Sequence, residues 1–282
     1  MAGTAFQTQY RDEFIAGFEQ RQSLLRGTVT SEANIKGNQA VFLVADSGGA
    51  TAVTRGPNGL IPSRDDNLNQ NTATITEWHD LVRKNRFNIV AGQSNQRAIM
   101  QQSTMAVINR KVDAQIITEL ETASVTTGAA QQGSLSLAMY AKTILGNADV
   151  PYDGQIHAVI TPAYEAYLMQ TKEFASADYV NSKPFEGHEG SNPQASTSFR
   201  WAGVNWCVHP NLSGKGTSSE TCFMYHSSAI GHAAAIESMD SKVGYEEEQD
   251  YSWARATIFM GAKLLQNSGV VKMIHDGSAY TP

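Results

Sequence analysis

The chain has 282 residues and is 41% hydrophobic, enough for a sizeable core and one or two domains. Its net charge of −6 argues against a dedicated nucleic-acid-binding protein, which would carry a basic field. Two cysteines make no disulfide framework, no apolar run reaches the roughly 18–20 residues of a membrane span, and the N-terminus lacks a signal peptide's apolar core. We therefore expect a cytoplasmic protein with reduced thiols. Only 17% of residues are charged, against about 25% in an average domain, which suits surfaces that neighbours cover.

An aromatic repeat marks the N-terminus. Phe6, Tyr10, Phe14 and Phe18 recur every four residues, which places them on one face of a helix. A short helix with nothing apolar beside it needs an outside surface to be stable. We therefore favour an N-terminal arm that docks on a neighbouring subunit, and a core helix is the alternative.

A long polar segment follows a short apolar strand at Ala40–Val44. Asp46–Ile75 is rich in glycine and also holds prolines and short apolar pairs, and loops of this length are usually functional or disordered. The apolar pairs favour an extended hairpin over the alternative of a floppy surface loop. As a hypothesis, its charged residues pair with a neighbour's charges: Arg55, Arg64, Asp65 and Asp66.

Strands and then the longest helix come next. Thr72–Val90 reads as one or two strands. Towards the end of this stretch, we expect one strand face to carry Phe87, Ile89 and Ala91. Asn95–Ala123 is predicted to be a helix of about 40 Å lying across a sheet. Its single apolar stripe is Met105, Ile108, Val112, Ile116 and Leu120.

The region Ser134–Asp240 alternates helices and strands and reads as one compact α/β lobe. We expect helices at Ser134–Leu145 and Ala163–Ala175, and strands at Gln155–Ile160, Trp201–Val208 and Thr221–Tyr225.

The closing stretch, Tyr245–Lys272, predicts a terminal hairpin. Trp253, Thr257 and Phe259 lie two or four apart, on one face of a strand. Asn267–Gly269 forms the turn, and the residues from Val270 carry a second strand. The segment holds no nucleophile, phosphate loop or metal signature, so it points to assembly rather than chemistry.

One set of residues has the composition of a metal site: Cys207, His209, Cys222 and His226. Separations of two and four keep side chains on one strand face, so the four could converge across a hairpin. The spacing differs from that of ordinary zinc knuckles, and buried cysteines with hydrogen-bonded histidines are the favoured reading, with a disulfide as a further alternative. The acidic run Glu246–Glu248 with Asp250 is read as a solvated face or an intersubunit strip. We expect no catalytic, cofactor-binding or metal-binding residues.

The order of these elements resembles the major capsid proteins of tailed bacteriophages, the fold named after coliphage Hong Kong 97. The likeness covers essentially the whole chain, and it includes FRWAGVNWCVHPNL, TCFMYHSSAIGHAAA and the ending SWARATIFMGAKLLQNSGVVKM. It implies an α+β fold with an N-terminal arm, an extended loop hairpin, a peripheral domain with a long spine helix, and an axial α/β domain.

The resemblance implies a division of the chain into five parts. These are an N-terminal arm (1–35), the extended loop and peripheral strands (36–92), the spine helix (93–133), the axial domain (134–240) and return strands of the peripheral domain (241–282). Asp46–Asn71 would lie over an adjacent subunit, and Trp253–Ile274 would return to the peripheral sheet.

The resemblance also implies the function and the partners. Copies of the chain would assemble through pentamers and hexamers into the icosahedral head of the virion, around double-stranded DNA that is bound without sequence specificity, in the host cytoplasm. A separate scaffolding protein, a portal and a decoration protein are the implied partners, with no membrane and no cofactor. A bacterial nanocompartment shell shares the fold and is the first alternative. A metal-dependent enzyme using the cysteines and histidines above is the second.

Overall fold

The computed structural model describes residues 20–32, 35, 37–65, 67–91, 95–175 and 198–278. The aromatic repeat Phe6, Tyr10, Phe14 and Phe18 and the charged residue Asp66 lie outside the described residues. No helix in the described ranges is long and apolar enough to cross a membrane.

The described part of the chain is built from five α-helices, three 3-10 helices and twelve strands. The helices are α1 (Arg86–Ala91), α2 (Gln96–Glu121), α3 (Leu135–Asn147), α4 (Pro162–Met169), α5 (Lys172–Ala175), η1 (Arg26–Thr28), η2 (Ser227–Ala229) and η3 (Asn267–Gly269). The strands are β1 (Thr30–Glu32), β2 (Gln39–Asp46), β3 (Asn67–Thr74), β4 (Thr76–Asn85), β5 (Gln131–Gln132), β6 (Ile156–Ile160), β7 (Ser198–Trp201), β8 (Val204–Val208), β9 (Glu220–His226), β10 (Ile230–Glu246), β11 (Tyr251–Leu264) and β12 (Val270–Asp276).

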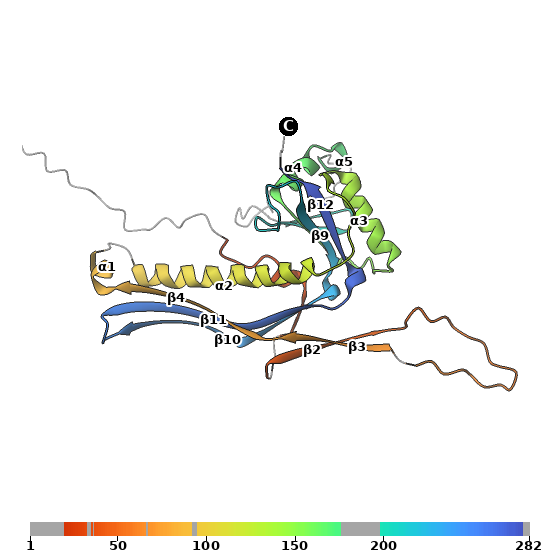
Figure 1. Cartoon of the computed structure of the whole chain (residues 1–282), viewed down its shortest axis with the longest axis horizontal. Coiled ribbons are helices and arrows are strands. Elements are labelled where there is room, and N and C mark those ends of the chain that lie inside the picture. Colours follow the sequence, from red (N-terminus) through yellow and green to blue (C-terminus); the bar gives the residue numbers. More distant parts are fainter. Residues whose placement is uncertain are drawn as a thin grey trace, which may run out of the picture.

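A long four-stranded sheet, in the order β1-β10-β11-β4, carries α2 along one face (Figure 1). The helix has 26 residues, and it is capped at its start by Asn95, whose side chain accepts a hydrogen bond from the Ala98 backbone N–H. The helix predicted over 95–123 and its place across a sheet are therefore confirmed. The predicted stripe is buried at Ile108, Val112, Ile116 and Leu120, whereas Met105 is only half-buried.

A second lobe stands at one end of α2 (Figure 1). Its six-stranded sheet has the order β5-β12-β9-β6-β8-β7, with α3 packed against β12 and β9. Ser134 caps α3 by accepting from the Leu137 N–H, and Thr161 caps α4 by accepting from the Tyr164 N–H. Pro162 occupies the first turn of α4, where its missing N–H leaves no bond unmade.

The chain crosses between the two sheets at η2, between β9 and β10, and at η3, between β11 and β12. The expected terminal hairpin is therefore wrong, as is the return of Trp253–Ile274 to one sheet. The predicted turn at Asn267–Gly269 exists, but it redirects the chain, and β12 then pairs antiparallel with β9. The pattern shows that β12 is apolar and extended, and it cannot show which sheet receives it.

Three local expectations are corrected. Phe87, Ile89 and Ala91 lie in helix α1 rather than in a strand, because the partner strand β11 begins at Tyr251, opposite Asn85, and the strand pairing ends there. The expected strand Trp201–Val208 is two strands, joined at Ala202 and Gly203. Both of these residues have positive φ, as a two-residue hairpin turn of type I′ requires.

The third correction concerns the helix expected at Ala163–Ala175, which is split into α4 and α5. The Gln170 and Thr171 N–H groups bond three residues back, to Tyr167 and Leu168. The Thr171 hydroxyl also donates to the Leu168 carbonyl, at 2.7 Å. These bonds tighten and end the first helix.

Candidate intersubunit surfaces

Strands β2 and β3 form a two-stranded ribbon that extends away from the body of the molecule (Figure 1). They pair along their whole length, from Gln39 opposite Thr74 to Asp46 opposite Asn67, so the predicted extended hairpin is confirmed. We call residues 39–74 the ribbon. The ribbon includes the loop that joins the two strands at its far end.

The base of the ribbon is fixed to the body by close packing. Ala40 and Ala73 are buried against Ala233 of β10, and the Phe42 ring packs against this cluster. The Asn71 side chain donates a hydrogen bond to the Leu265 carbonyl, at 3.2 Å. These contacts hold the ribbon at a defined angle to the long sheet.

The tip of the ribbon has turns of its own. The Gly56 N–H donates to the Leu60 carbonyl at 3.0 Å, and the Gly59 N–H donates to the Gly56 carbonyl at 2.9 Å. Gly59 has a φ of 73°, a conformation that glycine adopts without a steric penalty. Arg64 donates to the Ser47 carbonyl across the loop, at 3.1 Å.

The structure gathers three of the charged candidates on this loop. Arg55, Arg64 and Asp65 are all exposed, and none forms an ion pair with another described residue. Their pairing with a neighbour's charges remains a prediction. The acidic run at Glu247, Glu248 and Asp250 is exposed at the β10–β11 turn, as the solvated reading expects.

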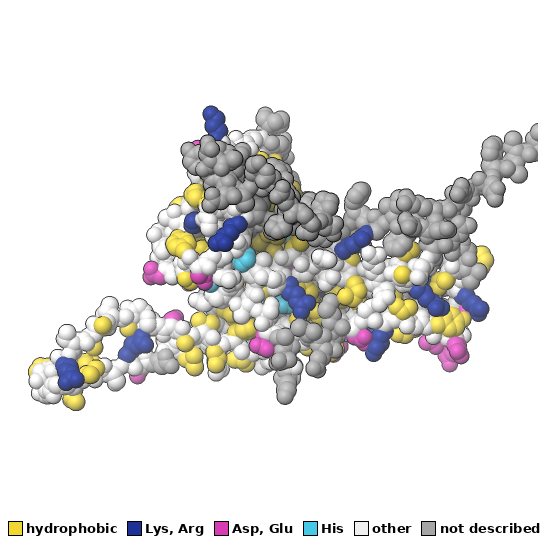
Figure 2. Space-filling model, turned by 180° about the vertical axis from the view of Figure 1, so that it is seen from behind, with side chains coloured by type: hydrophobic (Ala, Val, Ile, Leu, Met, Phe, Trp, Pro, Cys, Tyr) yellow, Lys and Arg dark blue, Asp and Glu magenta, His cyan; other side chains and the backbone are white. Residues whose placement is uncertain are grey.

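Sequence reasoning concentrated on charge and missed the apolar character of the ribbon. Six large apolar side chains on it are between 51% and 73% exposed: Val41, Leu43, Val53, Leu60, Ile61 and Leu68. We call these six residues the apolar strip. Figure 2 shows hydrophobic side chains along the projecting part of the molecule. Exposed apolar area concentrated on one projecting element marks an interaction site. The signal was visible as the pairs Ala52–Val53 and Leu60–Ile61, whose exposure the sequence alone could not establish.

The four residues considered as an alternative metal site do not come together. Cys207 on β8 and Cys222 on β9 are not neighbours across a hairpin, because β6 lies between these strands. Burial and, second to it, the Asp113 charge together raise the pKa of Cys207 to about 11. Burial is the main cause that raises the pKa of Cys222 to about 12. Both thiols are therefore protonated at neutral pH in the metal-free protein. No group of metal-binding side chains occurs in the described ranges, and both cysteines are free, so the disulfide alternative is also wrong.

The two histidines of that set have separate partners. His209 Nε2 lies 3.4 Å from Asp113 Oδ2, and His226 Nε2 lies 3.1 Å from Asp153 Oδ1. His226 Nδ1 also lies 2.8 Å from the Ser228 hydroxyl. This is the expected alternative of buried, hydrogen-bonded histidines.

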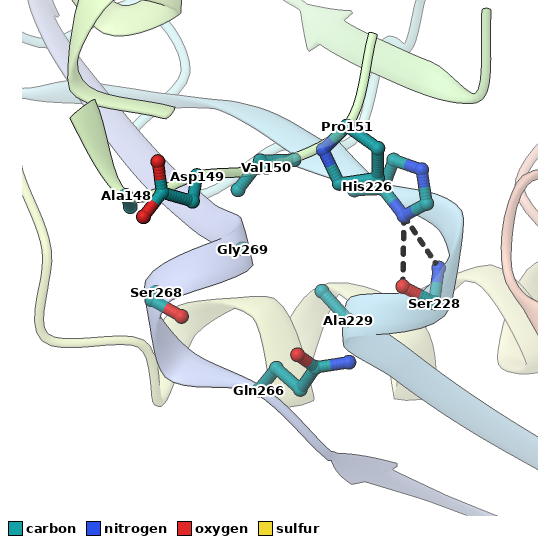
Figure 3. Close-up of a pocket in the computed structure, with 10 residues that line it drawn as sticks. All are labelled: Ala148, Asp149, Val150, Pro151, His226, Ser228, Ala229, Gln266, Ser268 and Gly269. Atoms are coloured by element: carbon teal, nitrogen blue, oxygen red, sulfur yellow. Dashed lines mark hydrogen bonds between the residues drawn. The ribbon is translucent and has the colours of Figure 1, made fainter. Parts of the chain in front are cut away.

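A shallow recess lies where the two sheets join, next to η2 and η3 (Figure 3). Its volume is about 70 Å³, and its lining includes Asp149, His226, Ser228 and Ser268. Pockets for drug-sized ligands are larger, about 300–1,000 Å³. The recess therefore has the size of a hydration site rather than a substrate site. In its wall, His226 is already hydrogen-bonded to Ser228.

Comparisons with solved structures agree with the fold. The chain aligns with the cyanophage Pam1 capsid with a TM-score of 0.73 and 12% identity, covering 99% of this chain and 98% of the other. For Mycobacterium phage Che8 the TM-score is 0.72 at 15% identity, covering 96% and 97% of the two chains. For the capsid of Ralstonia phage GP4 it is 0.68 at 12% identity, covering 99% and 97%. No curated protein sequence matches the chain.

These likenesses establish the α+β capsid fold over nearly the whole chain, and they do not favour the nanocompartment alternative. A family model described as phage capsid protein matches residues 2–276, which is far more than half of the sequence. The chain therefore belongs to the phage capsid protein family, a family of structural proteins of the virion.

Proposed function

We propose that this protein is the major capsid protein of a tailed phage, and that it self-assembles through pentamers and hexamers into an icosahedral head around double-stranded DNA. The observation that carries the assembly proposal is the apolar strip on the ribbon. Six large apolar side chains lie on an element that the described body of its own chain does not cover. Membership of the capsid family supplies the kind of partner, which is further copies of the same chain.

The physical character of the ribbon supports contact with a second copy. An isolated two-stranded ribbon is at best marginally stable in water, so a projecting one gains stability by packing on another surface. Rings close through head-to-tail contacts, between different surfaces of two copies. We therefore propose that the apolar strip packs on a different surface of the neighbouring copy.

We propose that the four-stranded sheet with α2 is the peripheral region and that the six-stranded lobe is the axial region around the five-fold and six-fold axes. The strand pairing supports boundaries different from those expected from the sequence. β10 begins at Ile230 and belongs with the peripheral sheet, whereas β12 (Val270–Asp276) belongs with the axial lobe.

We propose that the head assembles in the host cytoplasm with a separate scaffolding protein and a portal, and that a decoration protein can bind outside. The net charge of −6 suits a container that holds DNA without adhering to it sequence-specifically. We propose no enzymatic activity, because the family to which the chain belongs is one of structural proteins of the virion.

Negative-stain electron microscopy of the purified, concentrated full-length protein tests the proposal. We expect polyhedral particles tens of nanometres across. A discrete small oligomer over the whole accessible concentration range, together with the absence of native particles that contain this chain, would contradict the assembly proposal. If particles isolated from cells enclose a cargo protein instead of double-stranded DNA, the chain forms a nanocompartment shell.

A further inference from the structure

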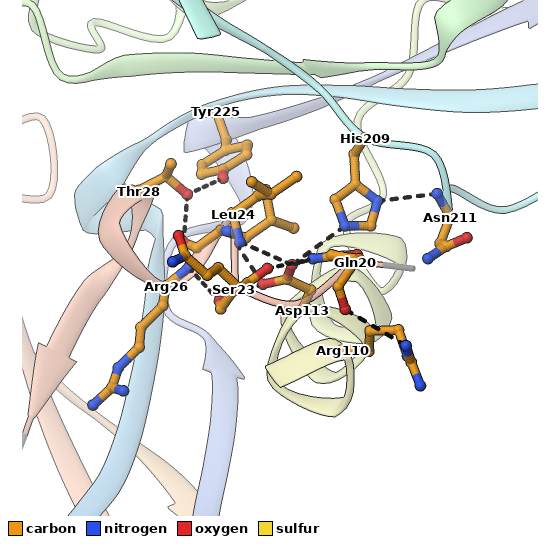
Figure 4. A network of polar contacts seen from close by, with 12 residues as sticks. Gln20, Ser23, Leu24, Arg26, Thr28, Arg110, Asp113, His209, Asn211 and Tyr225 are labelled. Atoms are coloured by element: carbon orange, nitrogen blue, oxygen red, sulfur yellow. Dashed lines mark hydrogen bonds and ion pairs between the residues drawn. The ribbon is translucent and has the colours of Figure 1, made fainter. Parts of the chain in front are cut away.

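A buried carboxylate on the long helix holds the first described segment of the chain. Asp113 of α2 is only 1% exposed, and its side chain receives a converging set of hydrogen bonds (Figure 4). Oδ1 accepts from the Ser23 hydroxyl at 2.5 Å and from the Leu25 N–H at 3.1 Å. Oδ2 accepts from the Leu24 N–H at 3.0 Å and from the Gln20 side-chain amide. One carboxylate thus accepts four hydrogen bonds from this segment.

We call residues 20–32 the strap, because they run from α2 across the junction between the two sheets. Beyond Asp113, the Thr28 hydroxyl bonds the Tyr225 hydroxyl at 2.5 Å, at the end of β9. The Thr30 hydroxyl donates to the Ser227 carbonyl in η2, at 3.1 Å. The strap then becomes β1, which pairs with the start of β10. It therefore contacts α2, the end of the six-stranded sheet and the edge of the four-stranded sheet.

His209 brings the six-stranded lobe to the same carboxylate. Its Nδ1 accepts from the Asn211 N–H at 3.2 Å, which leaves the proton of a neutral ring on Nε2. That Nε2–H points at Asp113 Oδ2, 3.4 Å away, and His209 follows β8 directly. The strap, α2 and the six-stranded lobe thus meet at Asp113.

The carboxylate is held as an anion. Burial alone would raise the pKa of Asp113, but the hydrogen bonds from His209, Ser23, Leu24 and Leu25 outweigh it and hold the pKa below the ordinary value. Hydrogen bonds to an ionised group are about twice as strong as neutral ones. The strap is therefore held by a charge at one point, in addition to packing of the fully buried Leu25.

We infer that Asp113 is a positioning residue for assembly. By clamping the strap over the sheet junction, it holds the strap, α2 and the six-stranded lobe in one arrangement, and this is the arrangement in which copies of the chain assemble. The inference rests on the proposed function, because it concerns the form of the subunit that meets a neighbouring copy. Asp113 itself is buried within its own chain.

The substitution Asp113→Asn tests this, since it keeps the shape and removes the charge. Hydrogen exchange of the peptide containing Leu24 and Leu25 reports on the strap, and electron microscopy with sedimentation reports the fraction of protein in particles. Glu119→Gln is the matched control, because Glu119 is also on α2 and accepts the Leu264 N–H at 3.1 Å without touching the strap. Ile116→Val is a core control that lowers stability with the strap intact.

We expect the rate of hydrogen exchange at the Leu24 and Leu25 amides to rise about tenfold or more in Asp113→Asn, because a charge-assisted hydrogen bond is lost. We also expect the particle fraction to fall well below that of the Ile116 variant at equal thermal stability. Should Asp113→Asn not fold, Ser23→Ala removes one bond to the same carboxylate and should show both effects more weakly.

Two results overturn the inference. One is a loosened strap with normal particle yield and size, and the other is particle loss that merely tracks thermal stability across all variants. Wild-type protein that forms no particles would instead overturn the proposed function, and the exchange rates at Leu24 and Leu25 would still show whether Asp113 holds the strap.

Discussion

The ring of Phe42 lies directly against Gly231, so that a Cβ at Gly231 would come within 2.9 Å of two ring carbons. Phe42 is on β2 of the projecting ribbon, and Gly231 is at the start of β10 in the body. The missing side chain of this glycine makes room for the ring. The angle at which the ribbon leaves the body therefore depends on this contact.

Gly231→Ala should displace the ribbon. The added methyl group overlaps the Phe42 ring, and overpacking of this kind costs about 1–3 kcal/mol. We expect a lower free energy of unfolding in urea and faster proteolysis within the ribbon. Gly27→Ala is the control, because a Cβ there has no atom within 4 Å. Phe42→Leu should relieve the Gly231→Ala defect, and equal losses in the single and double variants would contradict the explanation.

Polar substitution of the apolar strip should impair assembly and spare the fold. Leu43 and Ile61 are 60% and 67% exposed, so Leu43→Gln with Ile61→Gln should change the free energy of unfolding by no more than about 0.5 kcal/mol. The particle fraction measured by sedimentation should nevertheless fall strongly. Tyr152→Gln is the control, because Tyr152 is also a large exposed side chain, with an exposed fraction of 61%, and it lies on the six-stranded lobe rather than on the ribbon. Normal particles from the double variant would remove the strip from the interface.

Reversing the charges at Arg64 and Asp65 tests the electrostatic part of the same contact. Arg64→Asp with Asp65→Arg keeps the net charge, so a change in assembly reports specific pairing. We expect fewer particles and a monomer with unchanged circular dichroism. The effect should weaken with added salt, since exposed pairs are screened. Wild-type yields at low salt would show that these charges do not pair with a neighbour.

Much of the fold could be predicted because its elements carry local signals. The stripe Ile108–Leu120 predicts a one-sided helix, and Asp46–Ile75 predicts an extension because it is long, glycine-rich and interrupted by apolar pairs. Strand partners could not be predicted in this way. Val270–Asp276 would suit either sheet equally well, and its pairing with β9 is decided by the redirection of the chain at η3.

The candidate site was predicted only in part, for a similar reason. Arg64 and Asp65 are visible as charges in a polar loop, and they are exposed as expected. The exposure of Val41 and Leu43 depends on which face of β2 is covered, and that is fixed by Phe42 against Gly231, a contact 189 residues apart in sequence (231 − 42). Likewise, nothing near Asp113 in the sequence indicates that the strap bonds to it.

The stability of the monomer should depend on pH through His232. This side chain is fully buried in β10, and neither ring nitrogen has a hydrogen-bond partner among the described residues. The pKa of His232 is lowered to about 4, first by burial and second by the Arg26 charge, while the Asp113 charge opposes both. The unfolded chain binds a proton near pH 6.5, whereas the folded protein does so only near 4.

The sign follows from this difference. The contribution of His232 is complete above about pH 6.5 and is lost as the pH falls toward 4, by roughly 3 kcal/mol in total. Urea unfolding of wild type between pH 7 and 4 should therefore show a steeper loss than unfolding of His232→Met, which keeps the volume and cannot titrate. His157 and His275 also have lowered pKa values, caused first by burial, so both proteins keep some slope. Parallel curves for wild type and His232→Met would show that His232 is protonated equally in both states.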